Sequence, residues 1–140
     1  MRTFPVASQR PARFPPLVLL VDDSLDQLDL YEFALADRFA VLTASRGDAA
    51  VALAIAEQPD AIVVDLSMPG MDGWEVSRRL KHHPRTMDIP IIMLTASDGT
   101  GLDEQAARLH VTDVLHKPCA VDVLRDRLRA VTGESRPDAR

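Results

Sequence analysis

Residues 61–75, AIVVDLSMPGMDGWE, combine an apolar run, a single carboxylate and a sharp turn. Four apolar residues lead directly into Asp65, and Pro69, Gly70 and Gly73 follow within the next eight positions. An apolar run without alternation is typical of a strand that is covered on both faces of a sheet. Asp65 therefore stands at the end of a rigid strand, and we expect the turn after it to clear space above the carboxylate.

The rest of the chain alternates between short apolar runs and stretches with helical spacing. Strands are predicted over residues 17–21, 39–44, 61–65, 90–96 and 113–116. Helices are predicted over residues 24–37, 46–57, 73–82 and 101–109, and over a last segment with apolar residues at helical spacing: Val121, Leu124, Leu128 and Val131. Five strand–helix units predict an α/β fold, a doubly wound five-stranded parallel sheet with helices on both faces.

Polar residues mark the expected helix starts. Ser24 followed by Gln27, and Asp72 followed by Glu75, have the spacing of a capping box. Ser45 is expected to cap the second helix, because a serine hydroxyl can accept a backbone N–H of the first turn.

The length and composition of the chain indicate one small acidic domain. The chain has 140 residues and a formal net charge of −5, which argues against direct nucleic-acid binding through a basic face. Its single cysteine, Cys119, excludes an internal disulfide and suits a reducing, cytoplasmic compartment. No apolar run approaches the ~20 residues that span a bilayer, so no membrane insertion is expected.

The two ends of the chain differ in composition from its centre. Residues 1–16 contain four prolines and three arginines but no acidic residue, which predicts a mobile basic arm and not a signal peptide. Residues 133–140 predict a disordered tail, so the domain itself is expected over residues 17–132. Because so little chain follows this domain, we expect a stand-alone domain without a fused output domain.

The polar residues that carry chemistry stand where the predicted strands end. Asp22 and Asp23 follow the first strand, Asp65 ends the third, Thr95 lies at the end of the fourth, and Lys117 follows the fifth. The carboxyl ends of parallel strands meet at one edge of a sheet, which is where ligands bind in such folds. We therefore expect these five side chains to form one site.

This set of residue types predicts phosphoryl transfer. Three clustered carboxylates repel one another unless one is protonated or a cation lies between them. Oxygen ligands suit Mg²⁺, which also recruits a phosphate oxygen. With a lysine charge and a threonine hydroxyl nearby, Asp65 can act as a carboxylate nucleophile in a site where positioning and charge neutralisation dominate.

At this point the sequence resembles the receiver domain of response regulators in two-component signalling. The residues that carry the resemblance are VDDS (21–24), VVDLSMPGMDGWE (63–75), LTAS (94–97) and HKP (116–118), and it covers residues 17–132. The resemblance implies the flavodoxin-like strand order 2-1-3-4-5.

The resemblance also implies a role for each site residue. Asp65 would accept a phosphoryl group from a phosphohistidine of a sensor histidine kinase or a histidine phosphotransfer protein. Asp22 and Asp23 would hold Mg²⁺, together with Asp65 and the backbone carbonyl of Ser67. Such a domain catalyses its own phosphoryl uptake and hydrolysis but is not otherwise an enzyme.

By the same resemblance, Lys117 and Thr95 would contact the phosphoryl oxygens, and the Lys117–Pro118 peptide bond would be cis. Three positions depart from the usual family pattern: Val114 replaces an aromatic residue, His110-Val111 replaces a Gly-Ala pair, and Cys119 replaces a phenylalanine. These departures affect the usual aromatic readout and leave the acceptor chemistry unchanged, so activation is expected to use residues 97–101 instead.

Four further residues are expected to have structural and not functional roles. His82 and His83 are adjacent near a helix end, where cations are favourable, and they point apart, which disfavours a metal site. His116 is expected to face outward, and Trp74 is expected to be a half-buried packing residue.

The signal is expected to leave through a changed protein-binding surface toward a downstream target, or through relay of the phosphoryl group. Two alternatives remain open. One is a receiver-like scaffold that binds proteins independently of phosphorylation. The other is a small flavin carrier of the same topology, although such a carrier needs a neutral phosphate-binding loop where this chain has Asp22-Asp23-Ser24.

Overall fold

The computed structural model describes residues 13–96 and 101–133, and residues 1–12, 97–100 and 134–140 lie outside the described part. The strands are β1 (Leu17–Val21), β2 (Ala40–Ala44), β3 (Ala61–Asp65), β4 (Ile91–Thr95) and β5 (Asp113–His116). The helices are α1 (Leu25–Leu35), α2 (Gly47–Glu57), α3 (Gly73–Lys81), α4 (Leu102–Arg108) and α5 (Val121–Thr132). Elements thus alternate from the first strand to the last helix.

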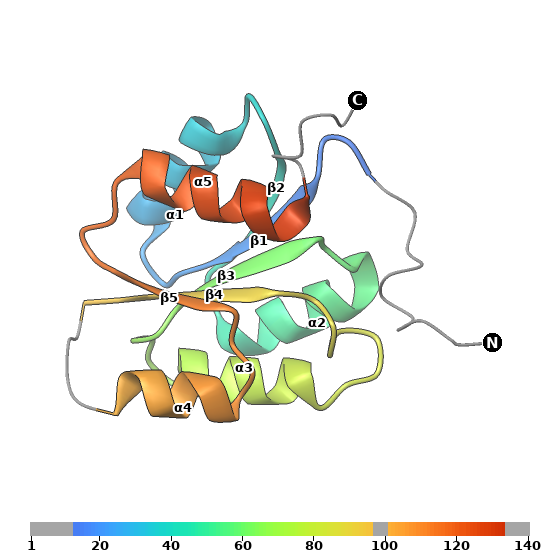
Figure 1. Ribbon diagram of the computed structural model, residues 1–140, viewed down its shortest axis with the longest axis vertical. Helices are drawn as coiled ribbons and strands as arrows, with labels where there is room; N and C mark the ends of the chain where they lie inside the picture. Colours follow the sequence, from blue (N-terminus) through green and yellow to red (C-terminus); the bar gives the residue numbers. More distant parts are fainter. Residues whose placement is uncertain (1–12, 97–100, 134–140) are drawn as a thin grey trace.

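All strand pairs are parallel, and the sheet has the order β2-β1-β3-β4-β5. Figure 1 shows three layers, with α1 and α5 on one face of the sheet and α2, α3 and α4 on the other. The predicted doubly wound α/β fold is confirmed. Because the chain winds outward in both directions from β1 and β3, the carboxyl ends of these two strands form the switch point of the sheet.

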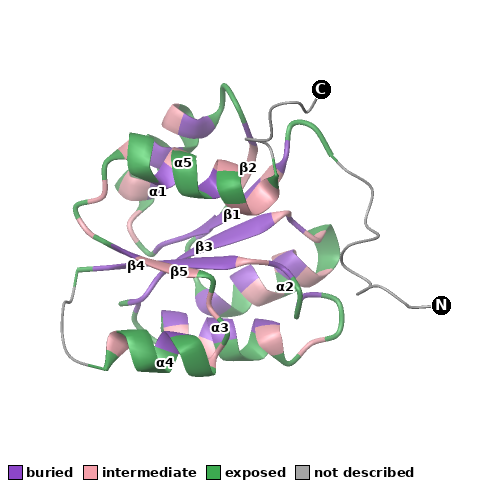
Figure 2. Ribbon diagram, in the orientation of Figure 1, coloured by how far each residue is buried: buried purple, intermediate pink, exposed green. Residues whose placement is uncertain are grey.

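The core consists of two layers because the central strands are buried on both faces (Figure 2). Alternate residues of a strand point to opposite faces, so each strand supplies both layers. The layer beneath α1 and α5 contains Val18, Leu20, Val63, Ile92, Leu28, Leu35, Leu124 and Leu128. The layer beneath α2 and α3 contains Leu19, Ile62, Val64, Ile91, Ala50, Ala54, Val76 and Leu80.

Two predicted helix caps are present as hydrogen bonds. The Ser24 hydroxyl accepts the backbone N–H of Gln27 at 3.2 Å, and an Asp72 carboxylate oxygen accepts that of Glu75 at 3.0 Å. The Glu75 carboxylate itself does not complete a capping box, since it is held by Arg78 and Arg79 on the next turn. These caps fix the start of α1, the helix that follows β1, and the start of α3, the helix that follows β3.

The predicted cap of α2 is wrong. The helix begins at Gly47, after Arg46, whose side chain makes no capping hydrogen bond. A Cβ atom on Gly47 would lie only 2.8 Å from Cβ of Met71, so the start of α2 is pressed against the segment that follows β3. Tertiary packing at Gly47, and not the hydroxyl of Ser45, therefore sets this helix start.

Residues 13–16 are the described part of the N-terminal segment. The Arg13 guanidinium donates to the carbonyl oxygen of Gln58 at 3.2 Å and lies 3.7 Å from the Asp60 carboxylate. The Pro16 carbonyl accepts the N–H of Ala40 at 2.9 Å. Within the described ranges, the helices are all too short or too polar to cross a membrane.

Candidate functional site

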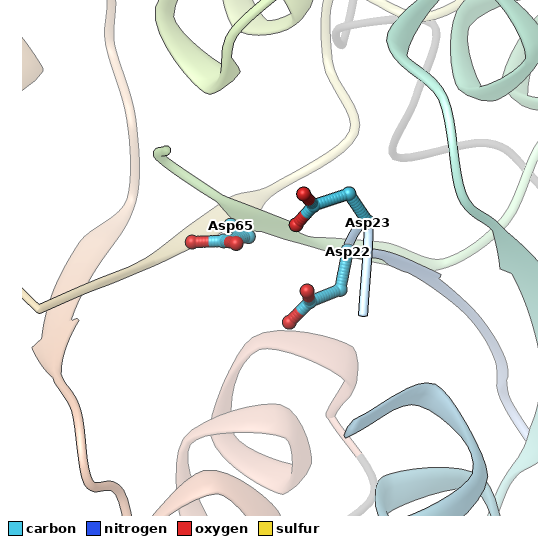
Figure 3. A group of neighbouring side chains, drawn as sticks. All are labelled: Asp22, Asp23 and Asp65. Atoms are coloured by element: carbon cyan, nitrogen blue, oxygen red, sulfur yellow. The ribbon is translucent and has the colours of Figure 1, made fainter. Parts of the chain in front are cut away.

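The predicted acidic residues meet at the carboxyl ends of β1 and β3. Val21 of β1 pairs with Val64 of β3, so Asp22 and Asp65 leave the sheet side by side. Together with Asp23 they form a group in which one carboxylate oxygen from each residue lies within 4.8 Å of those from the other two. Figure 3 shows the three carboxylates gathered at these strand ends. The sheet topology thus produces the cluster that the sequence predicted.

The backbone orients the two buried carboxylates in the same way. Oδ1 of Asp22 accepts the N–H of Ser24 at 2.9 Å, and Oδ1 of Asp65 accepts the N–H of Ser67 at 3.3 Å. Each bond spans two residues, which is the Asx-turn arrangement that bends the chain directly after an aspartate. The same bond that turns the chain therefore also holds one oxygen of each carboxylate in place.

Lys117 bridges the two buried carboxylates. Its Nζ lies 3.3 Å from Oδ2 of Asp22 and 3.5 Å from Oδ1 of Asp65. Its backbone N–H donates to the Thr95 carbonyl at 2.7 Å, which anchors the end of β5 to β4. The Lys117–Pro118 peptide bond is cis, as predicted. Lys117 follows the edge strand β5, and its side chain reaches the carboxylates at the ends of β1 and β3.

The two carboxylate oxygens of Asp65 differ in their partners among the described residues. Oδ1 receives both the Ser67 N–H and the Lys117 ammonium, whereas Oδ2 accepts no hydrogen bond from any residue in the described ranges. Asp65 as a whole is 6% exposed, and Asp23 beside it is exposed. Oδ1 of Asp65 is therefore held in place beside the positive charge of Lys117, and Oδ2 has no such partner among the described residues.

The charges of the site influence one another. Burial raises the pKa of Asp65, and the negative charge of Asp22 raises it further, while Lys117 and the Ser67 N–H act in the opposite direction. Burial acts to lower the pKa of Lys117, but Asp22 and Asp65 together outweigh it, so the net shift is upward. The amine is therefore a cation at neutral pH, and the acid cluster has excess negative charge that a metal cation would relieve.

The turn after β3 depends on two glycines. A Cβ atom on Gly73 would lie 2.7 Å from the carbonyl oxygen of Asp65 and 2.8 Å from Cα of Leu66, both backbone atoms that cannot move aside. The Gly73 N–H donates to the Leu66 carbonyl at 3.0 Å. Gly70 has a positive φ of 75°, a conformation that glycine adopts without strain. The start of α3 is thus packed directly against the backbone of Asp65 and Leu66.

The other predicted site residues occupy different positions around the cluster. Thr95 ends β4 and is fully buried, while Ser67 is exposed in the turn after β3. Val114, at the position of the usual aromatic residue, is half-buried in β5. Ser97, in the segment expected to change on activation, lies outside the described residues together with residues 98–100. His116 is exposed, as predicted.

The two adjacent histidines bind the backbone. Nδ1 of His82 lies 2.7 Å from the carbonyl oxygen of Arg78, and Nδ1 of His83 accepts the N–H of Arg85 at 3.0 Å. Trp74 is half-buried, as predicted. Two surface hollows of about 700 and 560 Å³ share Trp74 and Asp72 in their lining. Both are lined by residues of the turn after β3, and neither lining includes a carboxylate of the acidic cluster.

Tyr31 is a neighbour of the site that the sequence did not reveal. Its hydroxyl donates to the carbonyl oxygen of Cys119, two residues after Lys117, at 3.2 Å. In the sequence Tyr31 follows Leu28 by three residues and precedes Leu35 by four, so the helical pattern predicts only that its ring is buried. The hydrogen bond depends on a contact across 88 residues of sequence, which no local pattern indicates.

The donor set fits a hard divalent cation. The three side chains Asp22, Asp23 and Asp65 offer only oxygen atoms, and these atoms lie close enough together to share one ion. Mg²⁺ prefers oxygen ligands and binds through a few carboxylates while keeping several waters. Burial and, after it, the charge of Asp22 raise the pKa of Asp65, and a cation here would offset the repulsion from Asp22.

Comparisons with known sequences agree with this site. Residues 18–129 match the response regulator receiver domain family. Response regulator PleD of Caulobacter vibrioides is 40% identical over 116 residues, which are 82% of this chain and 26% of PleD. Protein PilH of Pseudomonas aeruginosa is 33% identical over 117 residues, 81% of this chain and 95% of PilH. Among the first curated relatives, the chain spans from about a quarter to about half of their length.

Comparisons with solved structures give the same result. Chemotaxis protein CheY4 of Vibrio cholerae superposes with a TM-score of 0.79 at 30% identity, over 83% of this chain and 98% of that chain. The receiver domain of sensor histidine kinase PA1611 from Pseudomonas aeruginosa has a TM-score of 0.77 at 28% identity, over 84% of this chain and 98% of that chain. That structure was solved with a magnesium ion coordinated in the active site cleft.

Proposed function

The chain belongs to the family of response regulator receiver domains, and from this premise we propose that it accepts a phosphoryl group on Asp65. The observation that carries the proposal is the state of the two Asp65 oxygens. Oδ1 is held by the Ser67 N–H and by Lys117, and Oδ2 has no hydrogen-bond partner among the described residues. A carboxylate with one oxygen fixed and one oxygen available is oriented for attack on phosphorus.

The proposed reaction transfers the phosphoryl group from a phosphohistidine. The free oxygen of Asp65 attacks the phosphorus, and a new O–P bond forms as the N–P bond breaks. The electron pair of the N–P bond leaves with the imidazole, which departs as a neutral ring because its other nitrogen carries a proton. The product is an aspartyl phosphate, and the chain is not an enzyme beyond this self-phosphorylation chemistry.

Mg²⁺ is the proposed cofactor. The carboxylates of Asp22, Asp23 and Asp65 would hold it, together with the backbone carbonyl of Ser67. When bound, it would neutralise negative charge on the carboxylates and on the phosphoryl oxygens. The all-oxygen cluster within 4.8 Å supports this assignment, and so does the magnesium ion in the PA1611 receiver.

Lys117 and Thr95 are the proposed contacts of the phosphoryl oxygens. The Lys117 ammonium lies beside Oδ1 of Asp65 at 3.5 Å, close to where a group on the neighbouring oxygen would be bound. Thr95 ends the adjacent strand, and its carbonyl is bonded to the N–H of Lys117 at 2.7 Å. A lysine ammonium can follow the oxygens of an incoming group, since it is a point charge on a flexible stem.

A receiver domain implies a histidine kinase as phosphodonor. We further propose that a histidine phosphotransfer protein can take this place. The output is a changed protein-binding surface or onward transfer of the phosphoryl group to a partner. This chain matches only about a quarter of PleD, so the activity of that longer protein is not proposed for it.

The test is intact mass after incubation with Mg²⁺ and acetyl phosphate, a small acyl phosphate donor. The wild type should gain one phosphoryl group, and Asp65→Ala should gain none. Asp126→Ala, which removes an exposed acid on α5, is the matched control and should be phosphorylated like the wild type.

A wild type that stays unmodified is then tested with a phosphohistidine-bearing kinase domain. If neither donor labels Asp65, the proposal is wrong, and the chain acts as a scaffold independently of phosphorylation. Labelling of Asp65→Ala to the same extent as the wild type would also contradict it, because the acceptor would then be another residue.

A further inference from the structure

Tyr31 is the one tyrosine of the chain, and its ring belongs to the core. It lies on α1 and is 6% exposed. Its neighbours in the same core layer include Leu28 and Leu35 of α1 and Leu124 of α5. Figure 1 shows α1 and α5 together on one face of the sheet. A phenylalanine would satisfy this packing equally well, so the hydroxyl needs a separate explanation.

The hydroxyl is bonded to the segment that carries Lys117. This segment, residues 117–120, connects β5 to α5 and is called the lysine loop below. Its first residue is anchored to β4 through the Lys117 N–H, and its last is anchored to α5, because the Ala120 carbonyl accepts backbone N–H groups of the first turn. The Tyr31 hydroxyl binds the Cys119 carbonyl between these two anchors, at 3.2 Å.

The middle of the lysine loop has few ways to be held. Pro118 has no N–H to donate. The Tyr31 hydroxyl supplies a hydrogen bond that joins the Cys119 backbone to α1. Burial raises the pKa of Tyr31, so the phenol keeps its proton and remains a donor at neutral pH. The bond therefore persists under the conditions in which the acceptor site works.

The position of the Lys117 amine depends on this loop. Nζ lies between Asp22 and Asp65, at 3.3 and 3.5 Å, at the end of a flexible four-carbon stem. The two ion pairs hold the amine, and the backbone of the lysine loop sets the region that the stem can reach. A shift of the lysine loop would move Nζ relative to both carboxylates, and phosphoryl transfer is sensitive to displacements of that size.

We propose that the Tyr31 hydroxyl is a positioning group for Lys117, acting through the carbonyl of Cys119. The proposal rests on the proposed function of Asp65 as phosphoryl acceptor, which gives the position of the lysine its consequence. Tyr31 touches neither the acceptor nor a proposed metal ligand. Its effect should therefore appear in the rate of phosphoryl uptake and not in the affinity for Mg²⁺.

The test compares Tyr31→Phe with the wild type. At saturating Mg²⁺, the rate of phosphorylation by acetyl phosphate, followed by intact mass, should fall on the order of tenfold, as expected for a displaced catalytic group. The Mg²⁺ affinity, measured by calorimetry, should stay unchanged. The urea midpoint should fall slightly, because one buried hydrogen bond is lost.

Thr86→Val is the matched control. The Thr86 hydroxyl is fully buried and donates to the Leu80 carbonyl at 2.6 Å, in the connection between α3 and β4. This variant also loses one buried hydroxyl-to-carbonyl hydrogen bond, but far from the lysine loop. It should lower the urea midpoint and leave the phosphorylation rate unchanged. An equal loss of rate in both variants would overturn the proposal, since the effect would then be general destabilisation.

A second comparison tests whether Tyr31 acts through Lys117. In a Lys117→Ala background, adding Tyr31→Phe should cause no further loss of rate, because the group that the hydroxyl positions is already absent. A further loss as large as that in the wild-type background would overturn the proposal, and so would a Tyr31→Phe rate equal to that of the wild type. If the wild type itself takes up no phosphoryl group from any donor, the proposed function has failed, and this inference falls with it.

Discussion

Asp65 is a carboxylate that the fold places in an unfavourable environment. It is 6% exposed, and its pKa is raised by burial and then by the charge of Asp22. Lys117 offsets only part of this effect, since it is shared between the two acids. Such a residue lowers the stability of the metal-free protein and is retained for its chemistry.

The first prediction concerns this residue. Because the folded-state pKa of Asp65 is raised, the folded protein binds more protons than the unfolded chain between the two pKa values, and its stability falls as pH rises through the folded value. Asp65→Asn does not titrate, so in EDTA it should have a higher urea midpoint than the wild type at about pH 8, with the gain shrinking toward about pH 4. Asp126→Asn, on the exposed face of α5, should show no such gain. A lower midpoint for Asp65→Asn at about pH 8 would contradict this account.

At the scale of the element, the start of α3 is set by backbone contact with β3. Gly73 stands where a Cβ atom would meet the Asp65 carbonyl at 2.7 Å, and Asp72 caps the helix beside it. The helix can therefore begin directly beneath the strand end that carries Asp65, the proposed acceptor. This close approach makes α3 part of the support of the site.

The second prediction follows from that contact. Gly73→Ala should lower the free energy of unfolding by about 1–3 kcal/mol through overpacking, and it should slow phosphoryl uptake because the backbone of Asp65 must shift. Gly133→Ala is the control, because Gly133 has a positive φ of 78° at the end of α5 but open space around it. It should cost about 1 kcal/mol from backbone strain alone and leave the uptake rate unchanged. Equal rates for both variants would show that the contact at Gly73 does not support the site.

The third prediction concerns α5, whose two faces differ. Leu124 is fully buried against the sheet, whereas its neighbour Val123 is 43% exposed. Leu124→Ala should lower the free energy of unfolding by about 2–5 kcal/mol, because it opens a cavity beneath the helix. Val123→Ala should change it by no more than about 0.5 kcal/mol. Chemical denaturation of both variants measures this difference, and similar costs would mean that α5 is not packed as described.

At the scale of the whole molecule, the parallel winding produces the acidic site. The sheet order brings β1 and β3 together at its centre, so the carboxylates that follow them share one space (Figure 3). The repulsion between Asp65 and the Asp22-Asp23 pair is a property of the fold, because the two strand ends that carry these residues are far apart in sequence. Any ligand that relieves the repulsion should stabilise the entire domain.

The fourth prediction follows from this linkage. Mg²⁺ should raise the free energy of unfolding by about 2.7 kcal/mol when its free concentration is about 100 times its Kd, because it binds the folded state. Asp23→Asn should lose most of this stabilisation without disturbing the core, since Asp23 is exposed. Thermal unfolding with and without Mg²⁺ measures the effect, and sodium chloride at matched ionic strength controls for screening. Equal stabilisation by sodium chloride would rule out a specific magnesium site.

Much of the fold could be predicted from local sequence. The strands over 17–21, 61–65 and 113–116 have the predicted bounds, since apolar runs ended by polar residues or turns are local signals. The cap at Ser24 was also correct. The cap at Ser45 was wrong, because the start of α2 is set by packing of Gly47 against Met71, 24 residues away in sequence.

The local sequence was enough to predict which residues carry the proposed chemistry. Asp22, Asp23, Asp65, Thr95 and Lys117 each stand at the end of an apolar strand, and that position is written in the local pattern of polar and apolar residues. The alternation of strands and helices then required the strand ends to meet at one edge of the sheet. The gathering of Asp22, Asp23, Asp65 and Lys117 could therefore be predicted before any distance was known.

How that site is held depends on contacts that form only in the folded chain. The bridge of Lys117 between Asp22 and Asp65 and the bond from Tyr31 to the lysine loop join segments that are far apart in the chain. Such contacts depend on how helices and loops settle against the sheet, and no periodicity encodes them. The sequence thus specifies the chemical groups of the site, while packing between distant segments specifies their geometry, because hydrogen bonds and close contacts form only where the folded chain brings their atoms together.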